Sequence, residues 1–302
     1  MAQIAERLLK ALKKHEKRKV VDLAGFRAAC DEARRLDETV QRDETFAELH
    51  PAHALLVAAQ NQLSVFVEIV TALSEMERFS EAIESAEEEY MPTGPPMSPL
   101  TNSFFSAWAY FDLCFGLRKE TLATCLIEVG RAMGLPGRLL ALWTLLQTSR
   151  LGIYEHQGTE DGLTVLSELI TGERARCLVP AGYPGRRGEL WLARVVPSPT
   201  PLFDGSVVMI TPYLLLQPGK REWLAYFERT LPKVPAKDET RAYETLMKHG
   251  LSRHYWSEFV TEAYVNHRSE VIFLAGLPDV DASRPHSRVN RDREPVSYRV
   301  RG

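Results

Sequence analysis

The sequence predicts an α+β protein: a helical N-terminal part, helices followed by a small five-stranded β-barrel or bent sheet of SH3-like or OB-like size, and C-terminal helices. The chain has 302 residues with 18 glycines and 18 prolines, yet Gly25 and Pro51 alone precede residue 91. Glycine and proline break helices, so their scarcity predicts a helical domain over residues 1–90. Residues 151–216 instead hold short apolar runs between turn residues, which predicts strands.

Three helices are expected in the first 90 residues. Apolar residues recur at helical spacing in residues 4–19, which predicts an amphipathic helix. A second helix is expected over residues 23–43. Proline is favoured in the first helical turn, where its missing N–H leaves no hydrogen bond unmade, so Pro51 predicts the start of a third helix. This helix is expected to continue into the acidic residues 75–90.

A proline-rich connector is expected over residues 91–101, which contain four prolines and one glycine. Such a segment forms neither a helix nor a central strand, because proline fixes φ and lacks a backbone N–H. We therefore expect the connector to separate the N-terminal domain from a core over residues 102–278.

The core is expected to begin with helices over residues 102–148. Aromatic residues in segment 104–115 recur at three- and four-residue steps, so they share one helix face that should pack in the core. Two further helices are expected over residues 119–134 and 136–148, separated by glycine and proline.

The expected barrel spans residues 151–216. Its strands are predicted from five short runs of β-type composition, at residues 153–156, 163–169, 175–179, 189–196 and 206–211. Turn residues separate these runs, and five short strands in so few residues favour a small, strongly bent sheet or a barrel.

Helices are expected again over residues 218–274. Segments 222–231 and 238–249 have helical spacing, and a long last helix is predicted from Ser252 to Leu274. Residues 279–302 form an Arg-rich, weakly patterned tail.

Composition excludes several classes of protein. The apolar and charged fractions, 45% and 25%, are those of a folded globular chain. Apolar runs fall well short of the roughly 18 residues that span a membrane. The basic N-terminus has no apolar core or cleavage site of a signal peptide, so we expect a cytoplasmic location and no membrane association.

Signatures of common enzymes are absent from the sequence. It has no G-x-x-x-x-G-K-[ST] phosphate loop, no G-x-S-x-G nucleophile elbow and no H-E-x-x-H helix. The four cysteines form no C-x-x-C pair and are expected to be reduced and mostly buried. We therefore expect neither a cofactor nor a metal site.

Four segments carry a resemblance to known proteins. The first is the aromatic helix with its aspartate, given by Trp108, Tyr110, Phe111 and Asp112. The others are Ser149-Arg150 followed by Tyr154-Glu155, then Leu169-Ile170-Thr171-Gly172-Glu173, and the run from Gly188 to Pro197. Residues 104–197 resemble the region that precedes the SEC-C zinc motif in uncharacterised bacterial proteins. The resemblance implies a shared fold segment in a bacterial protein. It transfers no active site, because this sequence lacks the Cys/His cluster of the zinc motif.

One row of residues suggests catalysis. His254, Glu258 and Glu262, followed by Asn266, stand at four-residue steps and would share one face of the predicted long helix. Such a row is suited to acid/base chemistry or to a metal-dependent hydrolase such as a nuclease. The alternative is an ordinary solvated helix face.

Two weaker histidine candidates are also present. His156 could pair with Asp161 across the loop after its strand, and His50 with His53 could contribute to a metal site.

Charge is distributed unevenly although the net charge is −3. Residues 1–19 hold seven Lys or Arg and two Glu, residues 68–90 hold eight Glu and one Arg, and residues 282–302 hold six Arg, one Asp and one Glu. The candidate binding residues are the basic ones of both termini and of the glycine-rich turn 182–188: Lys13, Lys14, Lys17, Arg18, Lys19, Arg186, Arg187, Arg288, Arg291 and Arg293. They are suited to a protein partner or to nucleic-acid phosphates, or they neutralise the acidic helix of the chain itself.

These observations favour a non-catalytic, cytoplasmic bacterial accessory or adaptor protein that binds a protein partner. The first alternative is a hydrolase that uses His254, Glu258 and Glu262. The second is a nucleic-acid-binding protein that uses its basic termini.

Overall fold

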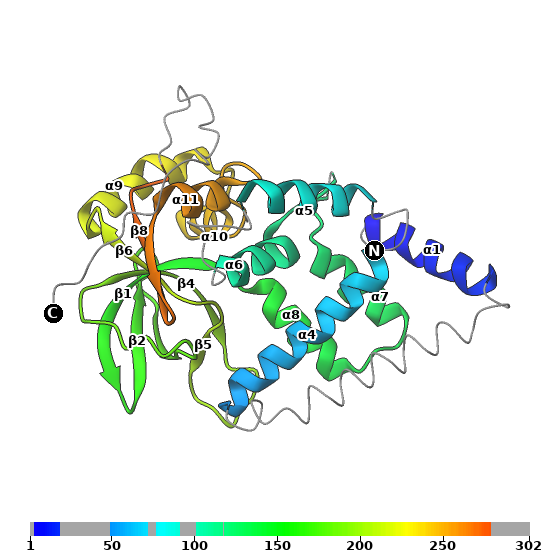
Figure 1. Ribbon diagram of the computed structural model, residues 1–302, viewed down its shortest axis with the longest axis horizontal. Coiled ribbons are helices and arrows are strands. Elements are labelled where there is room, and N and C mark those ends of the chain that lie inside the picture. Colours follow the sequence, from blue (N-terminus) through cyan, green and yellow to red (C-terminus); the bar gives the residue numbers. More distant parts are fainter. Residues whose placement is uncertain (1–2, 19–48, 72–76, 91–100, 117, 279–302) are drawn as a thin grey trace.

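The computed structural model describes residues 3–18, 49–71, 77–90, 101–116 and 118–278 (Figure 1). Helices and a small barrel lie side by side, and the C-terminal helices run along one side of the barrel. The predicted α+β architecture is therefore confirmed. The expected helix 23–43, nearly all of the connector and the Arg-rich tail lie outside the described residues.

The N-terminal helices pack directly on the helices that precede the barrel. The elements are α1 (Gln3–Arg18), α4 (Pro51–Thr71), α5 (Glu77–Tyr90), α6 (Thr101–Ala107), the π-helical turn η3 (Trp108–Asp112), α7 (Leu122–Ala132) and α8 (Gly137–Thr148). The indole N–H of Trp143 in α8 donates to the carbonyl of Ala59 in α4 at 2.9 Å. The backbone N–H of Ile4 in α1 donates to Glu120, just before α7, at 2.9 Å. The described helices before and after the connector thus share one hydrophobic core.

Pro51 begins α4 as predicted, and aromatic residues of α6 and η3 are buried as predicted. The expected helix 102–115 is shorter, because it widens into a π-helical turn at Trp108 and ends at Asp112. The acidic segment forms the separate helix α5.

The five predicted strands close into a barrel. They are β1 (Leu151–Glu160), β2 (Leu163–Glu168), β3 (Arg174–Leu178), β4 (Leu190–Pro197) and β5 (Ser206–Val208). Pairing runs β1–β2–β3–β5–β4 and returns from β4 to β1, with β3 and β5 parallel and the other pairs antiparallel. Side chains alternate between two faces along each strand. In β4, Trp191 and Ala193 belong to the smaller hydrophobic cluster, whereas Leu190 and Leu192 belong to the large core shared with the helices.

The predicted long helix from Ser252 to Leu274 is wrong. The chain forms α11 (Tyr255–Ala263) and then a hairpin of β7 (Tyr264–Arg268) and β8 (Val271–Ala275). Strand β8 pairs in parallel with β6 (Tyr213–Gln217), a strand that the sequence analysis missed. This pairing satisfies the backbone of β8 while Val271, Ile272 and Leu274 become buried, so non-local sheet formation overrides the helical spacing.

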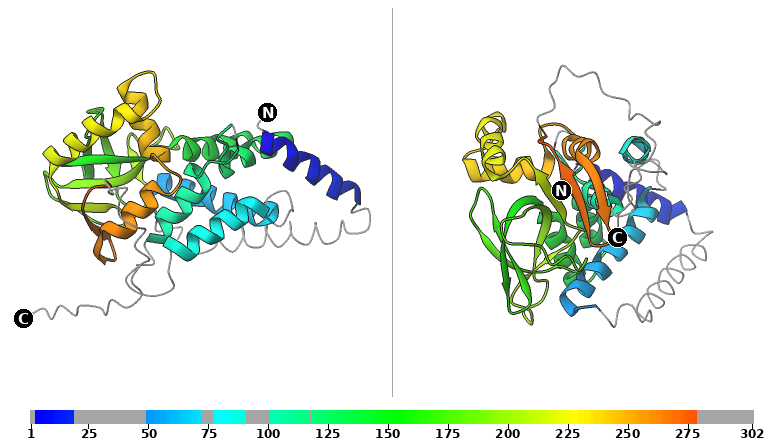
Figure 2. Two further views of the ribbon diagram at one scale, coloured as in Figure 1. Left: turned by 90° about the horizontal axis from the view of Figure 1, so that it is seen from above. Right: turned by 60° about the vertical axis from the view of Figure 1, so that its left-hand side comes forward.

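Helices α9 (Lys220–Thr230) and α10 (Glu239–His249), joined by the short 3-10 helix η4 (Leu231–Lys233), lie over one end of the barrel (Figure 2). Both were predicted. The carboxylate of Asp238 accepts the backbone N–H of Arg241 at 2.8 Å and caps α10. The cap fixes the start of α10 and the end of the segment that connects η4 to it.

Candidate functional site

A buried network of charges joins the helices to the barrel. The carboxylate of Asp112, in η3, pairs with Arg194 of β4, and it lies 3.3 Å from the ammonium group of Lys248 in α10. Arg194 and Asp112 are almost fully buried, with side-chain exposures of 1% and 2%. Arg194 and Lys248 also donate to the carbonyl of Ser149. The hydrogen bonds compensate these buried charges, so the network holds three elements in one arrangement.

A second buried network lies at the end of the barrel that α10 covers. Arg150, just before β1, donates two hydrogen bonds to the carboxylate of Glu168 in β2, at 2.5 and 2.9 Å. The hydroxyl of Thr171 donates to the same carboxylate at 2.7 Å. The guanidinium of Arg150 also lies 5.0 Å from the centre of the Tyr243 ring of α10. This network fixes the loop that follows β2.

Residues of the segments for which a resemblance was predicted belong to these two networks. Ser149 and Arg194 meet in the first network, and Arg150 and Thr171 meet in the second. Gly152 is required by the same packing, because a Cβ atom there would lie 2.5 Å from Glu168 and 2.6 Å from the ring of Tyr154. These residues therefore form part of the junction between helices and barrel.

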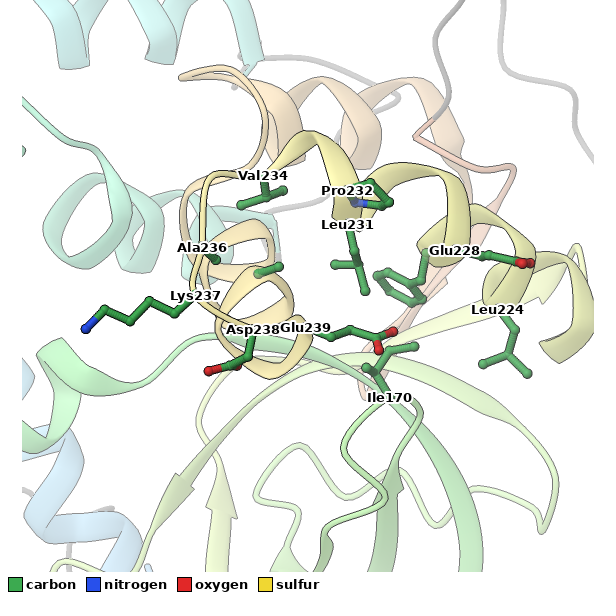
Figure 3. A pocket seen from close by; sticks show the side chains of 12 residues that line it. Ile170, Leu224, Glu228, Leu231, Pro232, Val234, Ala236, Lys237, Asp238 and Glu239 are labelled. Carbon is green, nitrogen blue, oxygen red and sulfur yellow. The ribbon is translucent and has the colours of Figure 1, made fainter.

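A pocket opens beside the second network. Its volume is about 550 Å³. It is lined by Ile170 from the loop after β2 and by residues of α9, η4 and the start of α10: Leu224, Phe227, Glu228, Leu231, Pro232, Val234, Ala236, Lys237, Asp238, Glu239 and Ala242. Figure 3 shows these side chains from three parts of the chain around one hollow.

The pocket combines apolar walls with an acidic rim. Phe227, Leu231 and Val234 are buried beneath it, and Leu224 is 38% exposed at its edge. Glu228, Asp238 and Glu239 contribute three carboxylates, against the single ammonium group of Lys237. In Figure 3 the carboxylate of Glu239 lies beside Ile170, whereas the Lys237 side chain extends away from the hollow. The pocket is thus suited to an apolar group that carries a positive charge.

The loop that supplies Ile170 is held in place by hydrogen bonds to Glu168 of β2. Thr171 binds Glu168 through its hydroxyl, and the backbone N–H of Gly172 donates to the Glu168 carbonyl at 3.0 Å. Gly172 has a φ of 69°, a conformation that glycine adopts without strain. The buried Arg150–Glu168 pair consequently positions one wall of the pocket.

The three predicted catalytic residues do not converge on this pocket. His254 precedes α11, and its ring lies 5.3 Å from that of Tyr90 and 5.5 Å from that of Trp108, centre to centre. Glu258 accepts a hydrogen bond from the Tyr90 hydroxyl at 3.4 Å, and Glu262 is exposed. Burial lowers the pKa of His254, an effect that the nearby Glu89 carboxylate opposes. His254 and Glu258 thus contribute to the contact between α5 and α11, and Asn266 lies on β7 instead of continuing their row.

Of the remaining histidine candidates, His156 and His50 have structural partners. The Nε2–H of His156 donates to the Pro184 carbonyl at 3.1 Å, and its Nδ1 accepts the Gly158 backbone N–H at 3.1 Å. Asp161 pairs with Arg176 instead. His50 accepts the backbone N–H of Ala52 and so supports the start of α4. The predicted His156–Asp161 pair is therefore wrong.

A Cys–His contact that was not predicted lies next to the first network. The Sγ atom of Cys114 is 3.4 Å from Nδ1 of His249, which is 2.9 Å from the carbonyl oxygen of Asp112. A carbonyl can only accept, so Nδ1 carries the proton and is not a base for the thiol. Burial raises the pKa of Cys114 and lowers that of His249. Both groups are held neutral, which is the opposite of an activated thiolate pair.

The predicted basic residues divide into three groups. Lys13 and Lys14 are exposed on α1, which also includes Lys17 and Arg18. Arg186 and Arg187 are exposed in the loop between β3 and β4. Lys19 and the tail arginines Arg288, Arg291 and Arg293 lie outside the described residues.

The pocket itself was not predicted, because its walls come from segments about 60 residues apart in the sequence. The nearest signal in the sequence was the Thr171-Gly172 turn.

Within the described ranges, no group of three or more His, Cys, Asp or Glu side chains is placed to hold a metal ion. No helix of the same ranges is both long and apolar enough to cross a membrane. Cys114, Cys125 and Cys177 are free thiols, and the last two are buried as predicted. Comparison with protein-family models, curated proteins and solved structures finds no match for this chain.

Proposed function

We propose that this chain is a non-catalytic adaptor of the bacterial cytoplasm that holds an apolar, positively charged segment of a protein partner in the pocket between α9, η4, α10 and the loop after β2. The observation that carries the proposal is the pocket itself, with buried apolar residues at its base and three carboxylates at its rim. An apolar anchor surrounded by a polar rim is the usual anatomy of a protein-binding site.

The chemistry of the lining supports binding more than catalysis. The residues around the pocket include no Ser, Cys, Thr or His, so its lining has no hydroxyl or thiol nucleophile paired with a histidine base. The hydrolase alternative relied on His254, Glu258 and Glu262, and two of these side chains serve the contact between α5 and α11. The adaptor hypothesis therefore remains the better supported of the two.

The size and charge of the pocket define the partner segment. A volume of about 550 Å³ accommodates a few side chains and not a folded domain. Leucine-like side chains would cover Leu224 and Phe227, while a Lys or Arg would reach Glu228 or Glu239. An amphipathic helix with basic residues beside its apolar stripe meets both requirements.

The proposal is tested with two synthetic helical peptides of about 15 residues that share one pattern of leucines, one with lysines and one with glutamates at the polar positions. Calorimetric titration of the full chain should show binding of the lysine peptide and none of the glutamate peptide. Leu224→Asp should abolish binding, because it places a charge at the apolar edge. Glu228→Lys should weaken it.

Leu216→Asp is the matched control, since Leu216 is 52% exposed in β6 and does not line the pocket. It should leave binding unchanged. Equal affinity for the two peptides, or full binding by Leu224→Asp, would refute the proposal. A photo-crosslinking residue at position 224, with position 216 as the control, would then identify the native partner and the segment that it contributes.

A further inference from the structure

A second surface lies where the loop between β3 and β4 meets the β7–β8 hairpin. Tyr183 of the loop and Phe273 of β8 pack against the same hydrophobic cluster, which includes Trp191 and Val271. Both residues are half-buried, so part of each side chain is accessible to solvent. The two segments are about 90 residues apart in the sequence, and the barrel brings them together.

Three arginines belong to the segments that carry these rings. Arg186 and Arg187 are exposed at the tip of the loop, and Arg268 of β7 places its guanidinium 5.7 Å from the centre of the Phe273 ring. Burial raises the pKa of the Tyr183 hydroxyl, and the positive charges of Arg186 and Arg268 oppose this rise. Aromatic rings and guanidinium groups therefore share one part of the surface.

The loop that presents Arg186 and Arg187 is preorganised. Its Gly185 has a φ of 66°, and a Cβ atom there would lie 2.5 Å from Trp191 and 2.6 Å from His156. The backbone N–H of Arg186 donates to the carboxylate of Glu189 at 2.9 Å, and the Tyr183 hydroxyl donates to the same carboxylate at 3.2 Å. A ligand that meets this loop pays little entropy for ordering it.

The carboxylates of this surface already have partners. Glu189 accepts from Tyr183 and Arg186, and Glu270 accepts from the hydroxyl of Ser269 at 2.7 Å. Three guanidinium groups against two hydrogen-bonded carboxylates leave a local positive charge. Partly exposed rings beside guanidinium groups match single-stranded nucleic acid, whose bases stack while its phosphates pair with arginine.

We propose that the surface formed by Tyr183, Arg186, Arg187, Arg268 and Phe273 binds single-stranded nucleic acid without base specificity. The site is separate from the pocket and does not depend on it. It is also distinct in the sequence from the basic termini.

The test uses the full chain and a fluorescein-labelled oligo(dT) of about 12 nucleotides, measured by anisotropy. Three phosphate contacts predict a roughly 20-fold loss of affinity between about 50 and 200 mM salt. Arg186→Glu with Arg187→Glu should reduce affinity at least about 10-fold at the lower salt concentration. Tyr183→Ala should reduce it about 10-fold, whereas Tyr183→Phe, which keeps the ring, should bind as the parent chain does.

Two controls separate this surface from the others. Arg241→Glu changes an exposed arginine of α10 and should have no effect. Replacing Arg288, Arg291 and Arg293 by alanine should also leave binding intact, and so should the pocket variant Leu224→Asp. Circular dichroism and thermal unfolding verify that each variant is folded.

Several outcomes would overturn the inference. They are no binding at about 50 mM salt, loss of binding in the tail variant with retention in the Arg186/Arg187 variant, or unchanged affinity of Tyr183→Ala. Equal competition by polyphosphate, together with that last result, would identify a simple anion site without base stacking.

Discussion

The carboxylate of Asp112 accepts a hydrogen bond from the guanidinium of Arg194, a residue 82 positions away in the sequence. Both side chains are buried, so each charge depends on the other. Asp112→Ala leaves Arg194 and Lys248 as uncompensated buried cations. We expect it to lower the free energy of unfolding by about 3–5 kcal/mol, measured by urea denaturation.

The double variant Asp112→Leu with Arg194→Met provides the control. It removes the carboxylate and the guanidinium together, although Lys248 keeps its carbonyl acceptors at Gln147 and Ser149. It should be clearly more stable than Asp112→Ala. If the single and double variants lose the same stability, then the pair is not coupled and the junction depends on packing alone.

Much of this fold follows from local patterns, and the exceptions have a physical cause. Pro51, the turn glycines and the apolar runs of the barrel act within a few residues, so their elements were predicted. Strand β8 pairs with β6, about 60 residues earlier, and no local pattern encodes that contact. The helical spacing of α11 therefore predicted one long helix in place of a helix and a hairpin.

The same reason explains why the candidate site was missed. His254 and Glu258 share a helical spacing, which makes them visible in the sequence, but their neighbours Tyr90 and Trp108 become known only in three dimensions. The pocket is formed by Ile170 together with helices from another part of the chain. Its lining residues are apolar or acidic and form no motif.

The hydroxyl of Thr171 offers a test of how the pocket wall is held. Thr171→Val keeps the shape of the side chain but removes the hydroxyl, which donates to Glu168 and accepts the backbone N–H of Glu173. We expect a loss of about 1 kcal/mol in the free energy of unfolding. Thr171→Ser keeps the hydroxyl and should lose much less.

Peptide binding shows whether Thr171 positions the pocket wall or only stabilises the fold. Because Ile170 precedes Thr171, Thr171→Val should also lower the affinity of the chain for the lysine peptide. Thr171→Ser should leave this affinity unchanged. Full peptide affinity in a destabilised Thr171→Val would show that the wall is fixed by other contacts.

Two glycines of the β3–β4 loop form a matched pair. Gly182 and Gly185 both have positive φ, 83° and 66°, so alanine is strained at either position. A Cβ atom at Gly182 meets nothing within 4 Å, whereas one at Gly185 would overlap Trp191 and His156. We expect Gly182→Ala to cost about 1–2 kcal/mol and Gly185→Ala roughly 3 kcal/mol or more in thermal unfolding. Equal losses would mean that the loop moves away from Trp191 without cost.

Acidification should destabilise the fold through its half-buried histidines. Burial lowers the pKa of His249 and of His254 below the ordinary value of 6.5, so both groups bind protons less readily in the folded chain than in the unfolded chain. The unfolded state therefore takes up more protons, and the free energy of unfolding should fall as pH drops through about 6.5 toward the folded-state pKa values. Denaturant unfolding at several pH values measures the slope of the unfolding free energy against pH.

His254→Phe keeps a ring between Tyr90 and Trp108 but removes the titrating nitrogen, so its slope should be shallower. Glu89 and Glu258 face His254 and favour its charged form, whereas Arg253 opposes it. An unchanged slope in His254→Phe would show that these carboxylates stabilise the protonated ring enough to cancel the cost of burial.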